Sequence, residues 1–263
     1  MIKSNHRKYG KPPFSIVVVH GGPGAAGGVA SVAKKLSEKH GVLEPFQTSR
    51  AIRGQIEELH SMISEHCSRP AVVIGHSWGA WLTFMLAAKY PDDVRKLILV
   101  SAGPFERGSD VTKTRLSRLT DAERIETLSI LGLMKIPPSG RLDSRTFRRF
   151  GELMSKADVL DPLEIEEDAP DFQPEIYRSV WSEAEKLRRD GGLLKFGEKI
   201  RCPVVAIHGD YDPHPAEGVK EPLERVVADF KFSLLQNCGH YPWKEKKARG
   251  EFFRILFEEI RTK

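Results

Sequence analysis

The ten residues AVVIGHSWGA, from Ala71 to Ala80, join a short apolar run to a serine flanked by small residues. Residues 71 to 74 are all apolar and predict a buried strand, and residues 78 to 90 are mostly apolar and predict a buried helix directly after it. Between them GHSWG, residues 75 to 79, matches the pattern G-x-S-x-G. A strand-to-helix turn this tight strains its middle residue and exposes that side chain at the end of the strand. We therefore predict that Ser77 is a nucleophile.

Apolar segments of the same kind recur along the chain. Strands are predicted where short β-branched runs are bounded by Gly, Pro or His, and helices where apolar residues recur at helical spacing. Because helices separate most of these strands, we expect the α/β class, with a mostly parallel sheet flanked by helices on both faces. The predicted strands are 14 to 20, 71 to 77, 96 to 102, 203 to 209 and 231 to 237, and the predicted helices are 28 to 39, 51 to 66 and 78 to 90.

The alternation of strands and helices stops after Gly103 and resumes near Ile200. The residues between show helical patterns, a Pro137-Pro138 pair, a basic patch and then an acidic segment without Lys or Arg from Asp161 to Glu175. This shift in composition predicts a helical lid, residues 104 to 195, inserted into a core domain of residues 1 to 103 and 196 to 263.

Composition narrows the functional classes. The 263 residues carry 41 Lys and Arg against 36 Asp and Glu, a formal charge of +5, and the basic residues are scattered without interleaved aromatics. Nucleic acid is therefore not an expected partner. No apolar run is long enough for a membrane span or a signal peptide, and the three cysteines form neither a disulfide framework nor a metal-ligand spacing. We expect a cytoplasmic protein with no membrane association, no metal and no cofactor.

A serine nucleophile needs a base within hydrogen-bond reach and a third group that orients the base. In a doubly wound sheet such groups come from the carboxyl ends of other strands. The strand ending at Gly209 is followed by Asp210 and Asp212, and the strand ending near residue 237 is followed by His240. His214 is a rival base, but it lies only two residues after Asp212 and so does not arrive from a separate strand end.

Four motifs in order, HGGPG (residues 20 to 24), GHSWG (75 to 79), HGDYDPHP (208 to 215) and GHYPW (239 to 243), resemble those of the α/β-hydrolase superfamily. The first two are most similar to the proline iminopeptidase branch. The resemblance implies an α/β-hydrolase fold in which Ser77 is the nucleophile and His240 the general base and then acid. It also favours Asp212 over Asp210 as the carboxylate that orients His240, because these families place the acid three residues after the glycine that ends the strand.

The oxyanion of the reaction needs two backbone N–H donors. The amide of Trp78, which follows the nucleophile, is the first candidate. The second comes from the glycine loop, where we favour Gly22, with Gly21 also possible and expected to lie against the substrate. His20 is predicted to hold this loop, and His76 to pack beside the site.

Three further features concern the substrate. Trp181 and Trp243 are candidates for lining the pocket, although packing is the default role of tryptophan. In iminopeptidases lid carboxylates receive the amino terminus of the peptide, so the resemblance makes Glu166 and Glu167 candidate ammonium acceptors. The alternative is a solvated acidic helix face. A set of cations is predicted to form a solvated helix start and not a binding site: Lys244, Lys246, Lys247 and Arg249.

These patterns together predict a serine hydrolase that cleaves small ester or amide substrates through an acyl-enzyme, in the manner of a carboxylesterase. A proline iminopeptidase-like aminopeptidase acting on short peptides is the alternative with the same triad. A non-catalytic homologue that binds a small ligand under the lid is the alternative of another class. The sequence makes no prediction of the oligomeric state.

Overall fold

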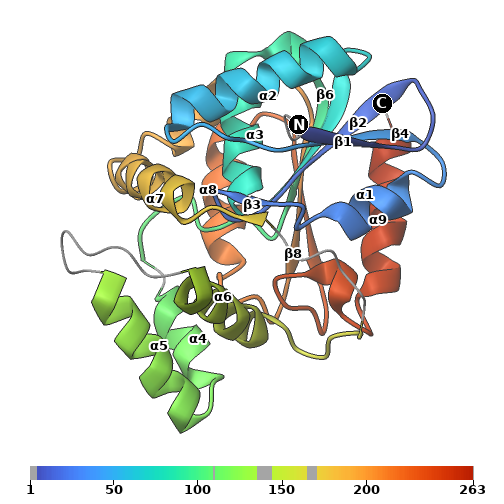
Figure 1. Cartoon of the computed structure of the whole chain (residues 1–263). Helices are drawn as coiled ribbons and strands as arrows, with labels where there is room; N and C mark the ends of the chain where they lie inside the picture. Colours follow the sequence, from blue (N-terminus) through green and yellow to red (C-terminus); the bar gives the residue numbers. More distant parts are fainter. Residues whose placement is uncertain (1–4, 109, 135–143, 165–170, 263) are drawn as a thin grey trace.

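A central sheet of seven strands organises the molecule (Figure 1). The computed structural model describes residues 5–108, 110–134, 144–164 and 171–262. The strand order is β1-β4-β2-β5-β6-β8-β9, and every neighbouring pair is parallel except β1 with β4. This confirms the predicted α/β class with a mostly parallel sheet. The strands are β1 (His6–Tyr9), β2 (Phe14–Val19), β4 (Gly41–Pro45), β5 (Ala71–His76), β6 (Val94–Val100), β8 (Val204–Gly209) and β9 (Phe230–Leu235).

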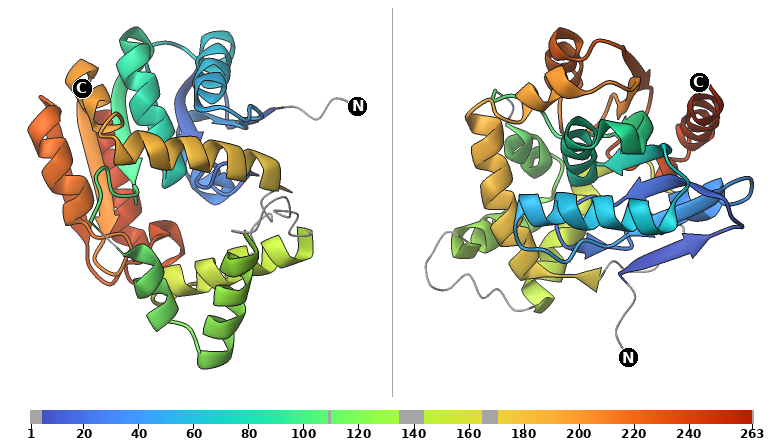
Figure 2. Two further views of the ribbon diagram at one scale, coloured as in Figure 1. Left: turned by 90° about the vertical axis from the view of Figure 1, so that its left-hand side faces the viewer. Right: turned by 90° about the horizontal axis from the view of Figure 1, so that it is seen from above.

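Helices cover both faces of this sheet (Figures 1 and 2). One apolar cluster joins the sheet to α2, α3 and α8, and a second joins it to α1 and α9. No helix within the described residues is long and apolar enough to cross a bilayer. The bounds are α1 (Ala30–Leu36), α2 (Ile52–His66), α3 (Trp78–Lys89), α8 (Glu217–Val226) and α9 (Arg249–Arg261), with short 3-10 helices η1 (Pro91–Asp93), η2 (Leu194–Lys199) and η3 (Pro242–Lys244).

Strand β2 shows why the sheet has two cores. Its residues point alternately to opposite faces, because side chains along a strand have a period of two. Val17 and Val19 belong to the cluster with α2 and α3, whereas Ile16 and Val18 belong to the cluster with α1 and α9. All four side chains are buried, which is why the strand is a continuous apolar run and not an alternating one.

A group of helices lies between β6 and β8 in the chain. Helices α4, α5 and α6 pack on one another at one end of the molecule, and α7 returns alongside α2 (Figures 1 and 2). A two-stranded sheet joins the glycine loop to the start of α7. We call these helices the α4–α7 segment. Its elements are α4 (Val111–Ser117), α5 (Asp121–Met134), α6 (Ser144–Asp158) and α7 (Pro174–Arg189), and the small sheet is β3 (Ala25–Ala26) with β7 (Asp171–Phe172).

Strand β1 at one edge of the sheet and its neighbour β4 were not predicted. Strand β1 carries charged and polar residues, and β4 contains Glu44 and Pro45, so neither has the apolar pattern of a buried strand. Glu44 is nevertheless fully buried, and its carboxylate accepts a 2.6 Å hydrogen bond from the Tyr9 hydroxyl. Pairing of β1 with β4 thus supplies a hydrogen-bond donor to a carboxylate that the sequence pattern alone would place in solvent.

Candidate active site

Ser77 occupies the turn between β5 and α3 in a strained backbone conformation, with φ 53° and ψ −115°. A positive φ costs a residue other than glycine about 1–3 kcal/mol, and it persists only where the surroundings impose it. A Cβ on Gly75 would lie 2.3 Å from the carbonyl oxygen of Gly79, and a Cβ on Gly79 would lie 2.6 Å from that of Val19. Both glycines therefore allow α3 to pack closely against the sheet, and this packing holds Ser77 in its strained turn.

His240 and Asp212 meet at the carboxyl ends of β9 and β8. The Nδ1–H of His240 donates a 2.8 Å hydrogen bond to Asp212 Oδ2, and both side chains are buried. Burial opposes ionisation of Asp212, but nearby imidazoles, His240 first among them, outweigh it and hold the pKa of this carboxyl well below its usual range. Burial likewise opposes protonation of His240, but the Asp212 carboxylate raises the pKa of this imidazole above its usual value.

The serine turn and the histidine loop are in contact through His76. The Nε2–H of His76 donates to the backbone oxygen of His240 over 3.0 Å, and the two ring centroids are 4.9 Å apart. Between these described residues no hydrogen bond joins the Ser77 hydroxyl to His240. Catalytic hydrogen bonds are often long before substrate binds and tighten afterwards. The structure thus places Ser77 beside the loop that carries His240, with the last bond of the predicted relay unformed.

The second oxygen of Asp212 binds His214. Both the Nδ1–H and the backbone N–H of His214 donate to Asp212 Oδ1, over 2.8 and 2.9 Å. The imidazole of His208 lies behind this pair, and its Nε2–H donates to the His214 carbonyl over 2.8 Å. The sequence analysis considered His214 only as a rival base. The two-residue spacing from Asp212 did not reveal that His214 binds the carboxylate oxygen that His240 leaves free.

Asp210 has a different role from Asp212. Its carboxylate accepts a 2.9 Å hydrogen bond from the backbone N–H of Cys238, and its own N–H donates to the Leu235 carbonyl. These bonds cross between two segments of the chain and are not the local backbone bonds of an aspartate in a turn. They tie the loop after β8 to the loop that carries His240.

The glycine loop lies directly against the serine turn. A Cβ on Gly21 would be 2.6 Å from His76 Nδ1 and 3.0 Å from Ser77 Cβ, so only glycine fits there without displacement. Gly22 has φ 64°, a conformation that favours glycine. His20 is fully buried and its Nδ1–H donates to the Gly21 carbonyl over 3.0 Å. On the other side Trp78 is the first residue of α3, so its amide has no acceptor within the helix.

The predicted substrate-contacting residues lie in different environments. Trp181 in α7 is half-buried and stacks on Trp81, with ring centroids 5.9 Å apart and planes at 7°. Trp243 is buried in the core with α9, and its ring meets His76 edge-on at 4.7 Å. Glu166 and Glu167 lie outside the described residues.

The α4–α7 segment is bonded to the histidine loop. The backbone N–H of His240 donates to the Asp158 carbonyl over 2.7 Å. The Asp158 carboxylate is itself buried and binds the Arg115 guanidinium through two hydrogen bonds of 2.7 and 2.8 Å. Bidentate pairs of this kind fix orientation as well as adding energy. The position of the His240 backbone therefore depends on contacts between α4 and α6.

Glu245 makes a second connection at the same place. Its carboxylate is fully buried and accepts three backbone N–H groups, from Gly239, Leu160 and Asp161, each at 2.9 Å. It thus joins the end of α6 to the residue before His240. Of the cations predicted to form a solvated helix start, Lys246 and Lys247 are exposed, whereas Lys244 and Arg249 are half-buried. Glu245 among them is buried, because the chain after α6 supplies its partners.

Comparisons with known proteins concern the family and the fold of the chain. Residues 16–253 match the model of the Alpha/beta hydrolase family. Over 193 residues the chain is 24% identical to Monoacylglycerol lipase ABHD6 of Bos taurus, covering 72% of this chain but only 56% of that protein. In an alignment 276 positions long it is 21% identical to Proline iminopeptidase of Lactobacillus helveticus, and this alignment covers 94% of this chain and 89% of that protein.

A solved structure, the monoacylglycerol lipase of Paleococcus ferrophilus, is similar with a TM-score of 0.62 at 19% identity, covering 97% of both chains. At this identity the likeness concerns the fold. The family match, in contrast, extends from β2 into α9 and includes the serine turn and both loops that meet beside it. The chain therefore belongs to the alpha/beta hydrolase family.

Proposed function

We propose that the protein is a serine hydrolase that cleaves small carboxylic esters through an acyl-enzyme. The observation that carries this proposal is the strained Ser77 turn, which contacts the loop of a buried Asp212–His240 pair. A serine hydroxyl becomes nucleophilic only when a base accepts its proton, and a carboxylate on Nδ1 leaves Nε2 of the imidazole free to do so.

In the proposed reaction Ser77 Oγ attacks the ester carbonyl carbon while its proton passes to His240 Nε2. The Gly22 and Trp78 amides hold the oxyanion. The C–O bond to the alcohol then breaks, and His240 gives its proton to the leaving alkoxide. Water attacks the acyl-enzyme with the same base, which releases a carboxylic acid and restores Ser77. Asp212 stays ionised and stabilises the imidazolium in both steps.

Aromatic side chains support an apolar acyl group as the substrate. Trp181 stacks on Trp81 and on Tyr177, with centroids 5.9 and 6.0 Å apart. Trp81 lies one turn beyond the serine in α3, and the other two rings lie in α7. We propose that residues 104 to 195 act as a lid over the core formed by residues 1 to 103 and 196 to 263, with Trp181 at its inner surface. Similarity to monoacylglycerol lipases also favours an ester.

The test is hydrolysis of p-nitrophenyl esters of increasing acyl length by three proteins: wild type, Ser77→Ala and Ser101→Ala. Ser101 is a matched control, because it is also a serine of positive φ at a strand end and it is fully buried. We expect Ser77→Ala to lose kcat by a factor on the order of 10⁶ and Ser101→Ala to keep it. Full activity of Ser77→Ala would refute the proposal.

Aminopeptidase activity is the second candidate, favoured by the match to Proline iminopeptidase over 94% of the chain. Prolyl and alanyl arylamides assayed beside the esters distinguish the two. Turnover of arylamides alone, with a KM that rises in Glu166→Gln and Glu167→Gln, would establish the aminopeptidase and the ammonium acceptors together. A protein that hydrolyses neither series but binds small ligands would instead be a non-catalytic homologue.

A further inference from the structure

Asp212 is shared by two imidazoles. His240 Nδ1 lies 2.8 Å from Oδ2 of this carboxylate, and His214 Nδ1 lies 2.8 Å from Oδ1. One ligand atom from each of the three residues can be chosen so that all lie within 4.8 Å of one another. The least buried of the three side chains, His214, is 11% exposed. Nitrogen and oxygen donors thus converge on one small volume from two separate loops.

This donor set suits a zinc ion. Zinc binds imidazole nitrogen and carboxylate oxygen at about 2.0–2.2 Å, usually in a tetrahedral arrangement. Its ligand atoms are then about 3.4 Å apart, so each atom of the Asp212, His214 and His240 set would move by about 1 Å or less to bind one. The carboxylate offsets one of the two positive charges of the ion, the imidazoles bind as neutral ligands, and water can complete the coordination.

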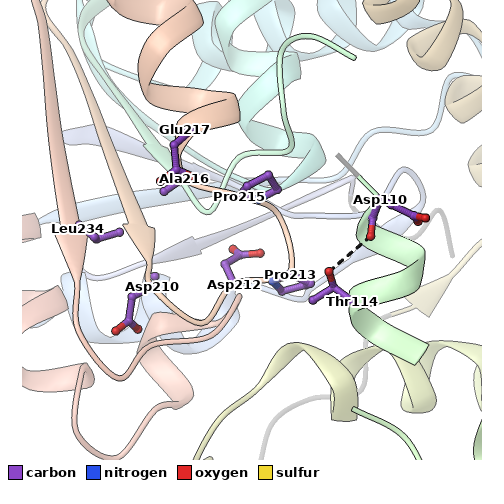
Figure 3. Close-up of a pocket in the computed structure, with 10 residues that line it drawn as sticks. Asp110, Thr114, Asp210, Asp212, Pro213, Pro215, Ala216, Glu217 and Leu234 are labelled. Carbon is purple, nitrogen blue, oxygen red and sulfur yellow. Dashed lines mark hydrogen bonds between the residues drawn. The ribbon is translucent and has the colours of Figure 1, made fainter. Parts of the chain in front are cut away.

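A pocket of about 430 Å³ opens onto Asp212, the carboxylate that the two imidazoles share (Figure 3). It reaches Asp212 and is lined by further carboxylates from Asp110, Asp210 and Glu217. None of the lining residues that the structure describes is basic. Acidic walls raise the local concentration of cations. The nearby Arg115 opposes this field, but its guanidinium is paired with Asp158.

We propose that Asp212, His214 and His240 form an inhibitory zinc site, reached through the acidic pocket. Zinc bound to Nδ1 of His240 replaces the proton on that atom. The neutral imidazole then carries its proton on Nε2, so it has no lone pair left to accept the proton of Ser77. Bound zinc also takes the Asp212 oxygen that orients the ring. The inhibition rests on the proposed hydrolase function, whereas the binding of zinc does not.

The experiment uses the full chain without an affinity tag, freed of metal with a chelator. Calorimetric titration with zinc chloride, and absorption of Co²⁺ as a spectroscopic substitute, measure binding. Hydrolysis of a p-nitrophenyl ester in the same buffer measures inhibition. We expect one zinc ion per chain, loss of hydrolysis in step with binding, and full recovery when the chelator is restored.

Two variants locate the site. His214→Asn keeps a side-chain donor for Asp212 but removes the imidazole, and we expect its zinc affinity to fall by at least about tenfold. His60→Ala is the matched control, because His60 Nδ1 also contacts a buried carboxylate, that of Asp93, at 2.6 Å, but the other oxygen of that carboxylate binds Arg69. We expect His60→Ala to bind zinc like wild type.

The outcomes distinguish failure of the zinc site from failure of the proposed hydrolase function. Equal zinc affinity or equal inhibition in wild type and His214→Asn would overturn the site, as would a wild-type chain that binds no zinc at millimolar concentration. Stoichiometric binding that depends on His214, in a chain that hydrolyses no ester, would keep the site and remove the proposed function. Hydrolysis that zinc does not affect would keep the function and remove the inhibition.

Discussion

Replacing Glu245 by glutamine tests the connection between α6 and the histidine loop. The three backbone N–H groups on the buried carboxylate face its two oxygens, Gly239 and Leu160 on Oε1 and Asp161 on Oε2. In Glu245→Gln one oxygen becomes an NH₂ group, so one donor is left facing another donor. A hydrogen bond to a charged group contributes about 1.5–3 kcal/mol, and a neutral acceptor weakens the two bonds that remain.

After subtraction of the smaller desolvation cost of an amide, we expect a loss of about 2–4 kcal/mol in the free energy of unfolding. For a domain of this size that corresponds to a fall in Tm of roughly 4–16 °C. Because Gly239 precedes His240, we also expect kcat for ester hydrolysis to fall at temperatures where the variant is folded.

Calorimetry and ester assays at 20–25 °C measure both effects, with Glu251→Gln as the control. Glu251 is an exposed glutamate that pairs with Arg254, and its loss should change stability by less than about 0.5 kcal/mol. A Glu245→Gln variant with the Tm and kcat of wild type would refute the reasoning, because the buried carboxylate would then hold neither the loop nor the fold.

Three further predictions concern the site itself. Asp212 raises the pKa of His240, so in a pH profile kcat/KM of wild type should fall as the pH drops through a value above 6.5. In Asp212→Asn this fall should occur at lower pH, and kcat should be lower by about 10⁴. Gly21→Ala places a Cβ 2.6 Å from His76 Nδ1 and should displace the glycine loop, so we expect kcat to fall by about 10²–10³. An unchanged kcat would exclude an oxyanion-binding role for this loop. Trp181→Ala should raise KM for long acyl esters by roughly tenfold and leave acetate esters unaffected, and equal changes for both would argue against an apolar contact.

The sequence predicted the central strands because each is buried on both faces. Strands β2, β5, β6 and β8 are mostly apolar and mostly buried, and their observed bounds overlap the predicted ones. Strand β9 was also predicted, although it lies at the sheet edge, is only partly buried and contains Lys231 and Ser233. Strands β1 and β4 carry polar residues and depend on each other for partners, as Glu44 and Tyr9 show. A pattern read along one segment contains no information about such a partner.

The same distinction applies to the candidate site. The serine turn is a local feature, and the strand before Ser77 together with the helix after it is enough to predict it. Asp212 and His240 could also be predicted, because each closely follows the end of a predicted strand and such ends meet at one edge of a parallel sheet. The contacts of Glu245, in contrast, depend on how the chain after α6 folds against the histidine loop, about 85 residues away in the sequence. The contact of His214 with Asp212 spans only two residues, but the spacing alone does not show that both imidazoles bind one carboxylate.

The central claim is that Ser77 is the nucleophile of a relay with His240 and Asp212. Its most direct test is covalent labelling of the native chain with a fluorophosphonate at neutral pH, followed by intact-mass analysis and peptide mapping. The account predicts one adduct per chain, on Ser77, that is absent from Ser77→Ala and retained in Ser101→Ala. A wild-type chain that stays unlabelled, or an adduct that persists in Ser77→Ala, would contradict it.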